Sequence, residues 1–180
     1  MHLRRHSPFK YRYEGNRLSF YACLFDVETV INELDEQGRA VTYTEVIRPG
    51  AFTDSLADPS VEVVFDIEHD TEHPYAKRSD GSLLLQEDPR GLFVSTWLTD
   101  ATVSARVESG ELDGCSFLFV PRVNRTANGV VERVAVSLHD VCLTATPAYP
   151  QTHGTVHLRA KSNDTHVRYL LARYRLAKMK

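Results

Sequence analysis

Segments in which apolar side chains recur at every second position constrain this chain more than any other feature. In the segment 61–68, the positions that would share one inward face of a strand are Val61, Val63, Phe65 and Ile67. In the segment 18–26 both faces are largely apolar, which indicates a strand buried on both sides. Segments 82–85 and 91–98 flank a polar turn and predict a hairpin. The chain is therefore expected to fold mainly into strands.

Two helices are expected between these strands. Pro49 and Gly50 break a short strand that begins at Tyr43, and a short helix is predicted after them, through Leu56. Thr99 or Asp100 can cap a second helix, which runs through Ser109. Strands with a few helices place the chain in the α+β class.

The remaining segments are predicted with less regular structure. The charged stretch 28–39 is expected to form a surface excursion without regular structure. A loop at 124–129 is expected to separate the strand that ends at Val120 from the segment 130–138, and 139–150 is expected to form a final strand. From Thr165 onward, apolar residues at helical spacing predict a basic amphipathic helix.

Length and composition favour one domain with a sizeable core. The chain has 180 residues, of which 42% are hydrophobic and 25% charged. A formal net charge of -3 gives no overall basic field, so no nucleic-acid partner is expected. The basic N-terminus lacks the apolar run of a secretory signal, and no apolar run approaches a membrane span. Three cysteines without metal-type spacing fit buried thiols in a soluble intracellular protein.

The segment 110–120 contains the candidate nucleophile. A glycine-bracketed turn delivers Ser116 to the start of an apolar strand. His69 ends a predicted buried strand, on the same face as Val61 to Ile67, and Asp140 begins another strand. All three could meet at one end of a sheet, where the imidazole would take the hydroxyl proton and the carboxylate would orient the imidazole. The residues alone leave open a core histidine, a capping serine and a turn aspartate.

Two other chemistries compete for the same residues. His69, Asp70 and His73 could form a metal cluster, although Thr71 and Pro74 disfavour the helix that would bring both histidines to one face. Cys115 could itself be a nucleophile. Adjacent side chains on a strand point to opposite faces, so only one of Cys115 and Ser116 can face a base, and buried free cysteines are usually packing residues.

Five blocks in order resemble the prohead (capsid-maturation) serine proteases of tailed bacteriophages, which are distantly similar in fold to the herpesvirus assembly proteases. The blocks lie between about Leu18 and Arg159 and comprise 45–52, His69-Asp70, 81–92, 110–119 and 143–150. The resemblance implies a compact, mostly antiparallel β-barrel-like core flanked by helices. It also implies an endopeptidase without a cofactor that acts inside the assembling prohead, in the host bacterial cytoplasm.

The resemblance further implies roles for individual residues. His69 would be the general base and Ser116 the nucleophile, with Asp140 as the third member where the family more often has glutamate. The substrates would be the major capsid protein and the scaffold domain, with self-cleavage as an extension, and a dimer is expected by analogy. Residues 1–160 are expected to form the protease domain, and 161–180 a cleavable or scaffold-binding tail. The main alternative is a non-catalytic capsid-assembly or scaffold protein; a metal-dependent hydrolase on His69, Asp70 and His73 is the other.

Overall fold

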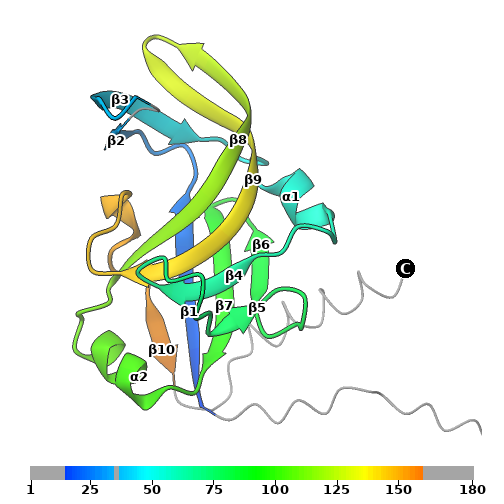
Figure 1. The fold of residues 1–180 in the computed structure, drawn as a ribbon, viewed down its shortest axis with the longest axis vertical. Helices are drawn as coiled ribbons and strands as arrows, with labels where there is room; N and C mark the ends of the chain where they lie inside the picture. Colours follow the sequence, from blue (N-terminus) through cyan, green and yellow to red (C-terminus); the bar gives the residue numbers. More distant parts are fainter. Residues whose placement is uncertain (1–14, 35–36, 160–180) are drawn as a thin grey trace, which may run out of the picture.

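Two sheets form the protein in the computed structural model, which describes residues 15–34 and 37–159. The first sheet has the antiparallel order β10 (His157–Arg159), β1 (Asn16–Leu24), β7 (Gly91–Leu98) and β6 (Leu84–Glu87). The second has the order β2 (Thr29–Leu34), β3 (Ala40–Ile47), β9 (Val130–Thr144), β4 (Val64–Ile67) and β5 (Ala76–Lys77). A further strand, β8 (Gly114–Ala127), pairs with β9 (Figure 1).

The β8–β9 hairpin is the longest feature of the fold. Its two strands curve across the molecule, and its tip projects at the top of Figure 1. Asn128 and Gly129 make the connection with φ values of 53° and 80°. Two consecutive positive φ angles match the right-handed twist of paired strands, and asparagine followed by glycine is the preferred sequence for them.

Strand β9 organises the second sheet because three strands pair with it. It runs antiparallel to β8 along most of its length. Its first residues pair in parallel with β3, and Asp140 to Leu143 pair in parallel with β4. The segment 139–150, expected to be a separate strand, is therefore continuous with 130–138 as far as Thr144.

The core lies between the two sheets and is rich in aromatic side chains. Phe20 of β1 packs on Phe65 of β4 with ring centroids 5.7 Å apart. Phe52 packs edge-on against Phe117 of β8 at 5.6 Å. These rings are buried, and their removal from water is the main contribution that holds the two sheets together.

Two α-helices are described, at the expected positions. α1 (Thr53–Ala57) follows the Pro49-Gly50 turn. α2 (Ala101–Glu108) begins at Asp100, whose side chain accepts hydrogen bonds from the backbone N–H groups of Thr102 and Val103. A short 3₁₀ turn, η1 (Pro150–Thr152), follows β9. Within the described ranges no helix is long and apolar enough to cross a membrane.

The α+β class and the hairpin at 82–98 are confirmed, whereas three other expectations need correction. The strand orders end in free edges, so the described residues form two open sheets rather than a barrel. The stretch 28–39 contains β2, which pairs with β3; its exposed edge position explains why it lacks an apolar alternation. The loop expected at 124–129 is shorter in the structure, because β8 extends to Ala127 and only Asn128 and Gly129 form the turn before β9. The tail 161–180 and the helix expected from Thr165 lie outside the described residues.

Candidate active site

The candidate residues gather on the face of the second sheet that points away from the core. Ser116 lies opposite Cys142 in the β8–β9 register, and Leu118 lies opposite Asp140. In the parallel β4–β9 pair, Asp66 lies opposite Cys142. Because side chains alternate along a strand, these residues share one face, while the neighbouring residues on each strand enter the core.

A β-bulge at His139 brings Asp140 to this face. Leu118 pairs with Asp140, but the next pair joins Phe119 to Leu138, so His139 is an extra residue. Leu138 is buried in the core, and without the extra residue Asp140 would share its face. The bulge instead turns Asp140 toward Ser116. A regular alternation in the sequence cannot reveal this shift.

His69 reaches the same face because the chain turns sharply after β4. Glu68 and His69 both have left-handed backbone conformations, with φ values of 58° and 61°. The Glu68 carboxylate accepts hydrogen bonds from the Thr144 hydroxyl at 2.6 Å and from the Ala145 backbone N–H at 3.0 Å. The prediction that His69 continues the inward face of β4 is therefore wrong, since the turn carries the imidazole to the opposite side of the sheet.

A continuous hydrogen-bond chain joins Ser116, His69 and Asp140. The Ser116 Oγ lies 3.0 Å from His69 Nε2, and both carboxylate oxygens of Asp140 lie 3.1 Å from His69 Nδ1. Since a carboxylate only accepts, Nδ1 carries the proton and Nε2 is free to accept the Ser116 hydroxyl. The Leu118 backbone N–H donates to Asp140 at 3.0 Å and helps to hold the carboxylate in place.

Burial differs among the three residues. Asp140 has no exposed surface and Ser116 is 6% exposed, whereas the His69 side chain is 40% exposed. The imidazole therefore lies at the surface, above a buried carboxylate. Hydrogen bonds to Asp140, and next to Cys142, raise the pKa of His69 well above that of an ordinary imidazole.

Asp66 and Cys142 are further polar residues on this face that sequence reasoning missed. Burial, and then the nearby Asp140 charge, raise the pKa of Asp66 to about 7. Burial also raises the pKa of the Cys142 thiol. One signal was available for Asp66, because an acidic residue interrupts an otherwise apolar segment between Phe65 and Ile67.

Cys115 points away from His69. Its side chain is buried in the core, and burial raises the pKa of its thiol far above the ordinary value. The Thr152 hydroxyl lies 3.1 Å from the Cys115 backbone nitrogen and 3.0 Å from its carbonyl oxygen. A buried thiol with a raised pKa is a poor nucleophile, so Cys115 is a packing residue here.

The structure does not gather the alternative metal ligands His69, Asp70 and His73. His73 Nδ1 lies 3.0 Å from the exposed Asp70 carboxylate, while both nitrogens of His69 contact Ser116 and Asp140. In the described part of the chain, the histidine, cysteine and acidic side chains that do cluster at metal-binding distances are His69, Asp140 and Cys142.

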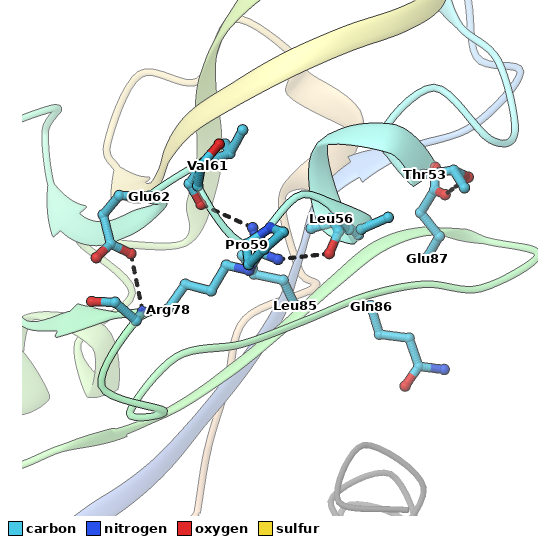
Figure 2. A pocket seen from close by; sticks show the side chains of 12 residues that line it. Thr53, Leu56, Pro59, Val61, Glu62, Arg78, Leu85, Gln86 and Glu87 are labelled. Atoms are coloured by element: carbon cyan, nitrogen blue, oxygen red, sulfur yellow. Dashed lines mark hydrogen bonds between the residues drawn. The ribbon is translucent and has the colours of Figure 1, made fainter. Parts of the chain in front are cut away.

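A prominent cavity lies elsewhere on the molecule. It has a volume of about 810 Å³ and lies between α1, the chain that follows it and β6 (Figure 2). Arg78 closes one wall by donating hydrogen bonds to the carbonyl oxygens of Leu56 and Val61. None of Ser116, His69 and Asp140 lines this cavity. Arg78 and Glu87, two of the charged residues that line it, are hydrogen-bonded within the protein.

Comparison with known families identifies the chain. Residues 8–167 match the family described as caudovirus prohead serine protease. The chain belongs to this family. Comparisons with curated proteins and with solved structures gave no match, so the expected likeness to the herpesvirus enzymes stays a prediction. Membership makes this a phage prohead protease, with a place in capsid maturation inside the assembling prohead.

Proposed function

We propose that this prohead protease cleaves peptide bonds with Ser116 as the nucleophile, His69 as the general base and Asp140 as the residue that orients the base. The observation that carries the proposal is the hydrogen-bond chain from Ser116 Oγ through His69 to the buried Asp140 carboxylate. Nucleophile, base and orienting acid within hydrogen-bond reach of one another are the arrangement that serine proteases of unrelated folds share.

The reaction follows from these contacts. Ser116 Oγ attacks the scissile carbonyl while His69 Nε2 accepts its proton, and the resulting imidazolium is stabilised by Asp140. His69 then donates the proton to the leaving amine, which departs from an acyl-enzyme on Ser116. A water molecule, deprotonated in turn by His69, hydrolyses that ester and restores the serine.

The environment of His69 favours its charged form. A carboxylate at 3.1 Å stabilises the imidazolium that forms in both half-reactions. The same contact keeps a larger fraction of the resting enzyme protonated at His69, where the imidazole cannot act as a base. Activity should therefore rise with pH through a range above the ordinary imidazole pKa of about 6.5.

The substrates proposed are the major capsid protein and the scaffold domain of the same phage, with self-cleavage near residue 160 that removes the basic tail. Support comes from family membership, since a prohead protease acts on proteins enclosed with it in the immature shell. A dimer is proposed by analogy alone.

Co-expression with the cognate capsid and scaffold proteins tests the proposal, with intact mass as the readout. The wild type should give discrete truncations that Ser116→Ala abolishes, since removal of a serine nucleophile costs several orders of magnitude in rate. Cys115→Ala is the matched control, because it removes a reactive atom from the adjacent residue on the opposite face and should leave the cleavage pattern unchanged.

Two results would contradict the assignment. Equal processing by the wild type and Ser116→Ala would move the chemistry away from Ser116. Intact substrates with both proteins, each shown to be folded by circular dichroism, would favour the alternative of a non-catalytic assembly protein.

A further inference from the structure

Asp66 is the most anomalous side chain in the described part of the protein. It has no exposed surface, and neither carboxylate oxygen has a hydrogen-bond partner of regular geometry among the described residues, although the nearby His69 backbone N–H partly offsets the rise in its pKa. Burying a carboxyl group without partners is costly, and such a group in a native structure calls for an explanation such as an ion or a functional role. The charged groups that act most strongly on Asp66 are Asp140, His69 and Asp70, two of which are acidic.

Three donor atoms of different types lie beside Asp66. One ligand atom each from His69, Asp140 and Cys142 lies within 4.8 Å of the other two. Cys142 is directly opposite Asp66 on the neighbouring strand, so the unpartnered carboxyl faces the same side of the sheet as this cluster. Imidazole nitrogen, carboxylate oxygen and thiolate sulfur are the ligands that Zn²⁺ uses in proteins.

We propose that His69, Asp140 and Cys142 bind one Zn²⁺ ion, with Asp66 supplying additional negative charge beside it, and that this metal-bound form is an inhibited state of the protease. The proposal that zinc binds at this site does not rest on the catalytic roles proposed above. The inhibition rests on the proposed function, because it requires His69 to be the general base.

The geometry requires only a small adjustment. Zinc bond lengths of about 2.0–2.3 Å place tetrahedral ligand atoms roughly 3.3–3.8 Å apart, so the three atoms would close by about 1 Å. The exposed imidazole of His69 can supply this movement, and it also gives the ion access to the buried Asp140 and Cys142. A water molecule completes four-coordination.

Binding and catalysis exclude each other through His69. In the structure, His69 Nδ1 contacts Asp140 and Nε2 contacts Ser116. When His69 is a zinc ligand, its ring can neither hold the proton on Nδ1 nor keep Nε2 aligned with Ser116. The Cys142 thiol loses its proton to the solvent when the metal binds, and no oxidation or reduction takes place. Zinc affinity should therefore fall as the pH is lowered.

The binding experiment uses the full chain carrying Ser116→Ala, which prevents self-cleavage. After chelation and dialysis, the protein is titrated with Zn²⁺ by calorimetry and with Co²⁺ by absorption spectroscopy. We expect one ion per chain, with Co²⁺ giving the visible bands of a tetrahedral site and a thiolate charge-transfer band. Cys142→Ser should abolish the thiolate band, whereas Cys115→Ser, which alters the other buried thiol on β8–β9, should retain it.

The variants Asp66→Asn and His73→Ala test whether zinc binds at the proposed site or at a site that involves His73. Asp66→Asn should weaken zinc binding by about 10-fold or more, as expected for a group just outside the ligands, while the protein stays folded. His73→Ala should have no effect. No stoichiometric binding, a thiolate band that survives Cys142→Ser, or binding lost in His73→Ala but kept in Cys142→Ser would overturn the proposed site.

Measurements of protease activity distinguish the proposed zinc inhibition from the proposed catalytic mechanism. Zinc at the measured dissociation constant should halve cleavage by the wild type, and a chelator should restore it. Relative to its own zinc-free activity, Cys142→Ser should require at least about 10-fold more zinc for half inhibition than the wild type does. Stoichiometric binding by Ser116→Ala without inhibition of an active wild type would overturn the inhibited state and leave the metal site. Binding by a protein that never cleaves would refute the protease mechanism alone.

Discussion

The two faces of the second sheet are built from the same strands and have opposite properties. On β4, Phe65 points into the core, and the next residue, Asp66, points to the candidate active site. On β8, Cys115 and Phe117 are core residues, and Ser116 between them faces His69. The core face is closed mainly by apolar side chains. The other face buries polar groups, of which Asp140 is hydrogen-bonded and Asp66 has no partner of regular geometry among the described residues, so its arrangement favours chemistry at the expense of stability.

Asp140→Asn should produce the largest effect on the face that carries the site. The amide preserves the shape, and its oxygen can still accept a hydrogen bond, but it carries no negative charge with which to stabilise the imidazolium of His69. We expect kcat/KM to fall about 10³–10⁴-fold, and the acidic limb of the pH profile to move to lower pH because the largest cause of the raised His69 pKa is removed. The measurement is cleavage of a capsid-derived peptide across pH.

Asp70→Asn is the control for this experiment. Asp70 lies one residue from His69, but its carboxylate is exposed and pairs with His73. Activity should stay within about 2-fold of the wild type, as expected for a surface substitution. A comparable loss in both variants would show that Asp140 has no special role.

Phe65→Ala should have the largest effect on the face that holds the two sheets together. The ring is fully buried and packs on Phe20, so its removal leaves a cavity and should cost about 3–5 kcal/mol of unfolding free energy. Urea denaturation measures the loss. Val64→Ala, on the other face of the same strand, should cost about 1 kcal/mol; similar losses in both variants would contradict the division into two faces.

Asp66→Asn should change how stability depends on pH. The Asp66 pKa is about 7 in the folded protein and about 3.9 when unfolded. Between these values the folded state binds more protons than the unfolded state, so the wild type loses stability as pH rises from about 4 to 7. The asparagine variant lacks this contribution and should gain on the order of 2–4 kcal/mol relative to the wild type across the range.

Urea titrations at several pH values, with a chelator present to exclude metal, give this comparison. The test lies in the slope and not in the absolute stability, because the buried amide brings its own desolvation penalty. Parallel pH profiles for the two proteins would show that Asp66 is not held in its neutral form.

Glu68→Ala should have a smaller effect than the substitutions at Asp140, Phe65 and Asp66. Two hydrogen bonds from Thr144 and Ala145 to Glu68 fix the left-handed turn that presents His69, and their loss should let the imidazole move away from Ser116. We expect kcat/KM to fall about 10-fold with KM nearly unchanged. Glu72→Ala, an exposed acid in the same loop, should leave activity unchanged; a drop in KM alone would argue against a positioning role.

The sequence predicts the strands and the residues of the candidate site better than it predicts how they meet. Period-two alternation identifies β1, β4 and the β6–β7 hairpin because each has at least one apolar face. It misses β2, whose edge position leaves Val30 and Leu34 exposed. The barrel expectation fails for a related reason, since closure depends on which strands pair across the chain and not on any local pattern.

At the site, residue types and order point to Ser116, His69 and Asp140, but their convergence depends on two backbone irregularities. The left-handed turn at Glu68 and His69 occurs at residues other than glycine, so no local sequence signal marks it. The bulge at His139 shifts the alternation of β9 in the middle of a strand. Both are specified by contacts with distant residues, which a single sequence does not display.

The three pairings of β9 also determine when a growing chain acquires its site. Ser116 and Asp140 come together within one hairpin, whose halves are neighbours in sequence and meet early. His69 joins them only after β4 docks in parallel against β9, a pairing that spans 76 positions between Val64 and Asp140. A ribosome-bound chain therefore lacks the contact between His69 and the Ser116–Asp140 pair until residue 143 has left the exit tunnel.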